Sequence, residues 1–102
     1  MTKDPQITAT VKDVLDLVKS ISPGKSVELR VPPYGVIQCV AGGNHRRGTP
    51  PNTVEMSGQT LVRLINEPSL WASLCDSGEV RASGLLSDLS NLFAQAAVKY
   101  RA

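Results

Sequence analysis

Hydrophobic residues in the first part of the chain recur at intervals of three and four positions. Between residues 4 and 22 they occupy one face of a predicted helix, as Ile7, Val11, Val14, Leu15, Val18 and Ile21. Asp4 followed by Pro5 favours a helix start, and Pro23-Gly24 favours a stop. Polar residues fill the opposite face, so we expect this helix to cover a core from outside.

The hydrophobic period then changes to two. Val27, Leu29 and Val31 alternate with polar residues, which predicts a strand with one buried face. The run Pro-Pro-Tyr-Gly at 32–35 interrupts it, and residues 35–41 resume as a second strand that pairs antiparallel with the first. Because residues 36–41 are apolar at most positions, we expect the second strand to be the more central one.

The second half of the chain predicts two further strands and three helices. A strand is expected at 53–56, a helix at 57–66 behind the N-cap residue Ser57, and another from Pro68 to Gly78. A strand at 79–83 and a helix at 87–100 follow. We therefore predict an α/β protein of the α+β type. Its mostly antiparallel sheet has about four strands, with helices packed on one side.

Composition narrows the class of protein. With 102 residues, 41% of them hydrophobic, the chain is expected to form a single domain over residues 1–102 with one core. The net charge of +2 is small and scattered, which argues against a nucleic-acid partner. No apolar run predicts a membrane span or a signal peptide, so we expect a cytoplasmic protein. Cys39 and Cys75 fit a reducing compartment as small buried residues, with a disulfide between them as the less favoured alternative.

The sequence lacks the patterns of self-sufficient catalysis. One histidine and two separated cysteines do not predict a metal site, and no nucleophile elbow or phosphate-binding glycine motif is present. We therefore expect no catalytic residue, no metal and no cofactor.

Residues 42–52 (GGNHRRGTPPN) are rich in glycine and proline and predict a loop. His45, Arg46 and Arg47 lie in it, and guanidinium groups bind carboxylates and phosphates through paired donors. One hypothesis is that these three residues form an anion-binding rim at the mouth of an apolar cavity. The alternative is that the arginines form surface ion pairs with Glu28 or Glu55.

The segment Val54–Phe93 resembles the C-terminal half of sterol carrier protein (type 2) domains. The resemblance rests on a strand, the run S-G-Q-T-L-V-R-L-I, a helix with Trp71, the run G-E-V-R-A-S-G and a leucine-rich helix. The runs V-E-L-R-V-P-P-Y-G-V-I-Q-C-V and H-R-R-G-T-P-P-N-T-V-E-M look like an actinobacterial branch of these proteins. They are also similar to the C-terminal domain of mycothiol-dependent maleylpyruvate isomerase-type proteins.

The resemblance implies non-catalytic binding of a lipid-like or other apolar or amphipathic small molecule in a cavity between sheet and helices. The matching positions that would line the cavity are Leu61, Leu64, Trp71, Leu89, Leu92 and Phe93. Trp71 and the leucines fit equally well as plain core residues. A second hypothesis is an accessory domain that cooperates with a separate mycothiol- and metal-dependent isomerase-like partner enzyme. A third is a filled core with no ligand.

Overall fold

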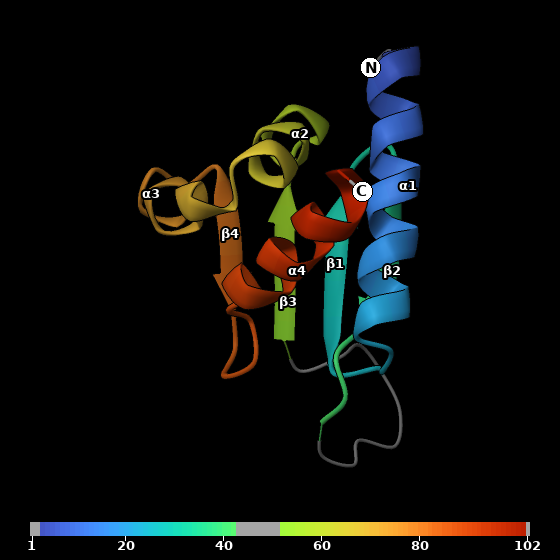
Figure 1. Cartoon of the computed structure of the whole chain (residues 1–102). Helices are drawn as coiled ribbons and strands as arrows, with labels where there is room; N and C mark the ends of the chain where they lie inside the picture. Colours follow the sequence, from blue (N-terminus) through green and yellow to red (C-terminus); the bar gives the residue numbers. More distant parts are fainter. Residues whose placement is uncertain (1–2, 43–51, 102) are drawn as a thin grey trace.

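One four-stranded sheet, covered by helices, organises the molecule (Figure 1). The computed structural model describes residues 3–42 and 52–101. In chain order the elements are α1 (Pro5–Ile21), β1 (Val27–Val31), β2 (Gly35–Cys39), β3 (Asn52–Met56), α2 (Gly58–Asn66), a 3₁₀ turn η1 (Pro68–Leu70), α3 (Trp71–Asp76), β4 (Val80–Ser83) and α4 (Ser90–Arg101). The predicted α+β class and element order are confirmed. Two helices begin later than expected: the last one starts at Ser90 instead of Ser87, and the helix expected from Pro68 starts as the turn η1 before α3.

The sheet is mixed but mostly antiparallel, with strand order β2-β1-β3-β4. β1 pairs antiparallel with β2, and β3 pairs antiparallel with β4, whereas β1 and β3 run parallel. The expectation that residues 35–41 form the more central strand is wrong, because β2 lies at the edge. Its apolar residues are divided between the two faces, and Val36 is 58% exposed. By contrast, β1 buries alternate residues completely and has a partner strand on each side.

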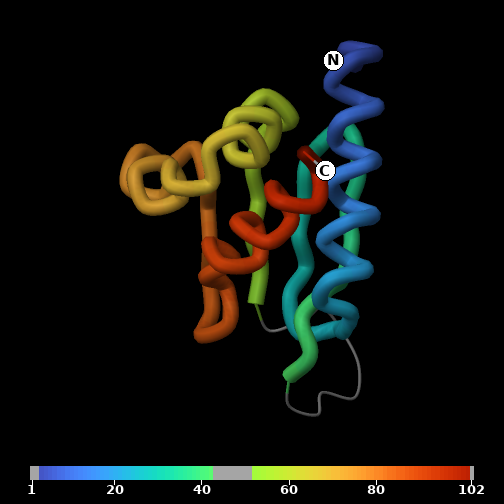
Figure 2. The backbone as a smooth tube through the Cα atoms, viewed as in Figure 1, coloured from blue at the N-terminus to red at the C-terminus, as the bar shows by residue number. Residues whose placement is uncertain are grey.

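The start of α1 is fixed by its capping residue. The Asp4 side chain accepts hydrogen bonds from the backbone N–H groups of Gln6 and Ile7, at 2.8 and 3.3 Å, and Pro5 takes the first helical position. α1 then runs alongside β2 and contacts α4 and α2 (Figure 2). The expected stripe of hydrophobic residues faces the core, since Val11, Val14 and Val18 are fully buried.

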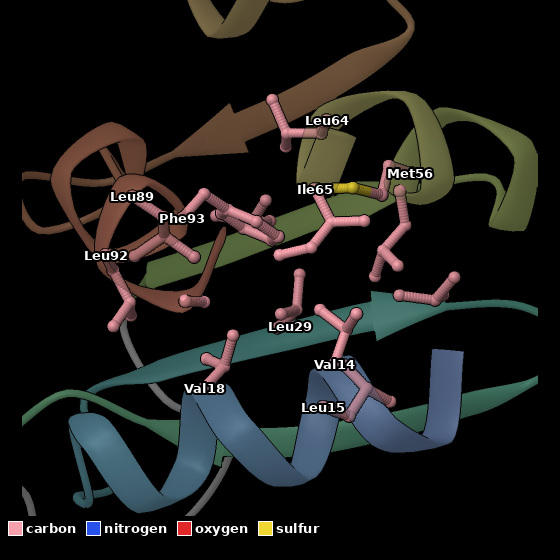
Figure 3. Close-up of a cluster of buried hydrophobic side chains, with 14 of the residues drawn as sticks. Val14, Leu15, Val18, Leu29, Met56, Leu64, Ile65, Leu89, Leu92 and Phe93 are labelled. Carbon is pink, nitrogen blue, oxygen red and sulfur yellow. The ribbon is translucent and has the colours of Figure 1, made fainter. Parts of the chain in front are cut away.

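The core lies between the sheet and the helices (Figure 3). Val14 and Val18 from α1 pack near Leu29 from β1. Ile65 from α2 and Phe93 from α4 complete the same core layer between the sheet and the helices. Each of these side chains is fully buried, which is worth roughly 1.5–3 kcal/mol per large apolar residue.

The opposite face of the sheet carries a network of charges on β1, β3 and β4. Arg30 pairs with Glu28 and, at 3.9 Å, with Glu55, which also pairs with Arg81 at 2.5 Å. These side chains alternate along the strands with the buried ones. The register of the sheet therefore separates an apolar inner face from a charged outer face.

Candidate ligand-binding cleft

An open cleft of about 430 Å³ lies where the end of α1, the end of β2 and the start of α4 meet. We call it the α4 cleft. Six of its ten lining residues are aliphatic and the other four are polar, with Asp88 as the one charged side chain among the described residues that line it. The lining residues are Ile21, Ser22, Val40, Leu85, Leu86, Asp88, Leu89, Asn91, Leu92 and Gln95. A cleft of this size, apolar with a few polar groups, suits a small amphipathic ligand.

Backbone strain is concentrated at Val40 in the wall of the cleft. Val40 has φ of +67°, a left-handed conformation that is a genuine outlier for a β-branched residue. Two backbone hydrogen bonds hold it there: its N–H donates to Ser22 at 2.8 Å, and its carbonyl accepts from Ser26 at 3.0 Å. Gly24 makes this arrangement possible, since a Cβ there would lie 2.2 Å from the Val40 carbonyl oxygen. Strain of this kind clusters at functional sites, so it supports the α4 cleft as a candidate site.

A buried asparagine fixes the other wall. The Asn52 side chain donates to the carbonyl of Ser26 at 2.8 Å and accepts from the backbone N–H of Leu86 at 3.0 Å. It therefore joins the start of β1 to the connection between β4 and α4. That connection turns at Gly84, whose φ is +110° and whose Cβ position would overlap the Asn52 amide. The same connection delays α4, which begins at Ser90, and Asp88 accepts a hydrogen bond from the Ser90 N–H at 2.9 Å just before the helix.

The six residues expected to line an apolar cavity do come together. Leu61, Leu64, Trp71, Leu89, Leu92 and Phe93 all belong to the buried core cluster. The Trp71 and Phe93 rings stack with centroids 6.0 Å apart. Leu89 and Leu92 also reach the α4 cleft, so this cleft opens from the region that the resemblance indicated.

The predicted rim residues His45, Arg46 and Arg47 lie outside the described residues. The two described positions that flank their segment both adjoin the α4 cleft. A Cβ on Gly42 would lie 3.1 Å from the Leu86 side chain, and Asn52 bonds to the backbone of Leu86. The carboxylates named in the alternative hypothesis, Glu28 and Glu55, both pair with arginines of the sheet.

Titratable groups near the cleft are few. Hydrogen bonds from Ser90 lower the pKa of the exposed Asp88 carboxyl. Cys39 and Cys75 are free thiols, and burial raises the pKa of Cys39 to about 11. Within residues 3–42 and 52–101 no three His, Cys, Asp or Glu side chains gather as metal ligands do. In the same part of the chain no helix is both long and apolar enough to cross a bilayer.

Sequence reasoning missed Val40, Asn52 and the pair Leu85-Leu86. The strained backbone of Val40 and the burial of Asn52 depend on contacts with Gly24, Ser26 and Leu86, distant in sequence. The leucine pair did carry a local signal, because two adjacent leucines follow a glycine between a predicted strand and a predicted helix.

Comparison with known proteins identifies the family. The model of the family described as bacterial SCP ortholog matches residues 3–94. The chain belongs to this SCP2-like family. Such domains are generally associated with lipid binding and are typically non-catalytic.

The fold is shared with a solved structure titled "UbiJ-SCP2 Ubiquinone synthesis protein". The TM-score is 0.55 at 20% sequence identity, and the match covers 100% of this chain and 98% of that one. This comparison supports the fold alone. No protein in the curated comparison matches the sequence.

Proposed function

We propose that this SCP2-like chain binds a lipid-like or amphipathic small molecule without catalysing its conversion, and that the ligand enters through the α4 cleft. The observation that carries the proposal is an aliphatic cleft of about 430 Å³ that shares Leu89 and Leu92 with the buried core. An acyl chain in the cleft would contact these leucines, while Asn91 and Gln95 would face its polar end.

Three sequence predictions belong to this proposal. His45, Arg46 and Arg47 would supply donors for an anionic headgroup. Leu61, Leu64, Trp71 and Phe93 would lie further along the path of the ligand. Residues 1–102 would act as one cytoplasmic domain, in keeping with the two free thiols.

The sharpest test is to fill the cleft with a large side chain. Asn91 is exposed on α4 and lines the cleft, so Asn91→Trp should block the site without disturbing the core. Wild-type protein titrated with long-chain fatty acids and acyl-CoA should show a rising Tm, because a ligand at 100 times its Kd stabilises by about 2.7 kcal/mol. Asn91→Trp should weaken the binding at least ten-fold, as measured by displacement of a fluorescent fatty acid.

Val98→Trp is the matched control, because Val98 is 72% exposed on the same helix but does not line the cleft. It should bind within two-fold of wild type. If no member of the lipid panel raises the Tm, the proposal fails, and the accessory role beside an isomerase-like partner or the filled core takes its place. If Asn91→Trp binds like wild type, the ligand enters elsewhere.

A further inference from the structure

One edge of the sheet is left open by the described part of the chain. Among residues 3–42 and 52–101, β2 pairs with β1 alone, so within this part of the chain one side of its backbone has no partner strand. The other edge strand, β4, has α3 beside it and carries the charged residue Arg81 (Figure 1). β2 has the sequence Gly-Val-Ile-Gln-Cys and contains neither a charge nor a proline, the residues that commonly keep an edge strand from pairing. The edge of β2 is therefore suited to accept another strand.

Helix α1 covers the inner face of β2 along the length of the strand. At the first residue of the strand, a Cβ on Gly35 would lie 3.1 Å from the buried Leu15 side chain. At the other end, the N–H of Val40, one residue beyond the strand, donates to the Ser22 carbonyl at 2.8 Å. The helix and the strand therefore run in the same direction, and one flank of α1 follows the strand from end to end.

Two lysines lie on the flank of α1 that faces this edge. Leu17 lines a surface hollow together with Tyr100 of α4, whereas Leu15, about 200° away around the helix axis, contacts β2. The flank near α4 and the flank near β2 are therefore different sides of α1. Lys12 is three residues before Leu15 and Lys19 is four residues after it, so both stack with Leu15 on the β2 side, and both are exposed.

The charge beside the open edge is positive on balance. Asp16 pairs with Lys12 at 3.3 Å, but among the described residues no carboxylate pairs with Lys19. On the outer face of the sheet, Glu28 of the neighbouring strand β1 pairs with Arg30. Because each nearby carboxylate is matched by a cation, Lys19 leaves a positive charge next to a strand that has no charge of its own.

We propose that β2 binds an extended acidic segment of a partner protein, which joins the sheet as an additional strand. Backbone hydrogen bonds to β2 would supply affinity, and carboxylates of the segment would contact Lys12 and Lys19. A second copy of this chain fits less well, because pairing two β2 edges would bring the lysines of both copies together. The proposal does not depend on the α4 cleft, since neither the two lysines nor residues 35–39 line it.

The test uses the full chain and two fluorescent peptides of about six residues, the length of a typical strand. One peptide alternates glutamate with valine, and the other alternates lysine with valine. Fluorescence anisotropy should show binding of the acidic peptide and at least ten-fold weaker binding of the basic one. Lys12→Glu/Lys19→Glu should weaken binding of the acidic peptide at least ten-fold.

Lys99→Glu/Arg101→Glu is the matched control for this variant. It makes the same change of charge at exposed positions of α4, on the other side of α1 from β2. At physiological ionic strength, charges more than about 8 Å apart are largely screened, so the control should bind the acidic peptide within about three-fold of wild type.

Amide hydrogen exchange of the wild-type protein tests the mode of binding without any substitution. Alternate N–H groups of β2 point away from β1, so they should exchange rapidly in the free chain and become protected when the acidic peptide is bound. If they are already protected in a monomeric free chain, the chain itself covers the edge and the proposal is wrong. A dimer in sedimentation equilibrium that protects the same groups would replace the partner by a second copy.

Two results of the peptide titrations would also overturn the proposal. One is equal binding of the acidic and basic peptides, and the other is unchanged binding of the acidic peptide to Lys12→Glu/Lys19→Glu. Circular dichroism of each variant must match wild type. If the lysine variant does not fold, the exchange experiment and the comparison of the two peptides on wild-type protein decide the matter.

Discussion

Glycine at position 24 is required by the approach of another backbone segment. Its φ is +155°, and an added Cβ would overlap the Val40 carbonyl, with its oxygen at 2.2 Å and its carbon at 2.3 Å. A backbone neighbour cannot move aside as a side-chain tip can. Gly78 has a positive φ as well, of +82°, but nothing lies within 4 Å of its Cβ position. Gly24 therefore combines an unfavourable backbone conformation with a close backbone contact, whereas Gly78 has only the unfavourable conformation.

We predict that Gly24→Ala destabilises the protein by about 2–4 kcal/mol, whereas Gly78→Ala costs only about 1 kcal/mol. Urea unfolding of both variants, followed by far-ultraviolet circular dichroism, measures the difference. Equal losses in the two variants would mean that the close contact with Val40 carries no energy.

Because of Cys39, we expect the free energy of unfolding to fall at alkaline pH. Burial raises the pKa of this thiol from its ordinary 9.0 to about 11, so the folded state holds the proton more tightly than the unfolded chain does. The stabilisation is therefore complete below pH 9 and is lost as the pH rises through 11. The total loss is roughly 3 kcal/mol, since each pK unit corresponds to 1.36 kcal/mol.

The measurement is urea unfolding of wild type and Cys39→Ala between pH 8 and 11. The variant has a smaller core side chain and starts less stable, but the gap between the two proteins should close as the pH rises. Cys75→Ala should keep most of the wild-type pH dependence, because Cys75 is only partly buried. A gap that stays constant over this range would show that Cys39 ionises equally readily in both states.

At the scale of elements, local signals in the sequence were sufficient for most of the fold. The Asp4-Pro5 start of α1, the Ser57 cap of α2 and the glycine after α3 each act within one helical turn, so each could be read directly. The alternating pattern of β1 likewise predicted which face is buried.

The predictions that proved wrong concern features that depend on contacts between residues distant in the sequence. An apolar strand such as β2 was expected near the centre, but sheet order depends on which strands pair, and β1 pairs with both β2 and β3. The parallel β1–β3 pair has the same origin, because nothing near Asn52 in sequence reveals that it lies opposite Val27. The predicted start of α4 at Ser87 is too early because Ser87 belongs to the preceding turn, where its hydroxyl donates to the Gly84 carbonyl.

At the scale of the whole molecule, the sequence predicted which helix residues gather in the core, but it did not predict the α4 cleft. The six predicted cavity residues form one cluster because the helical period already placed them on inward faces. The α4 cleft, however, lies where the ends of α1, β2 and α4 meet, so no single segment of the sequence predicts it. Leu85 and Leu86 become candidate site residues only because they line that cleft.

The remaining prediction concerns Arg46 and Arg47, whose segment begins and ends beside the cleft. If they contact an anionic headgroup, replacing both with alanine should weaken binding of a fatty acid by about 1.5–3 kcal/mol for each charged hydrogen bond lost. Binding of the uncharged methyl ester should not change, because only the carboxylate contacts the arginines. Unfolding stability should stay within about 0.5 kcal/mol, as for ordinary surface substitutions.

Lys12→Ala/Lys99→Ala is the control for this double variant. It removes the same charge from exposed positions on α1 and α4 that do not line the α4 cleft, so it accounts for any general loss of attraction to anions. Calorimetric titration of the three proteins with the acid and its ester gives the comparison. Equal weakening by both pairs of substitutions would reduce the effect to net charge. Unfolding of the Arg46→Ala/Arg47→Ala protein would assign the arginines a structural role, such as the ion pairs with Glu28 or Glu55.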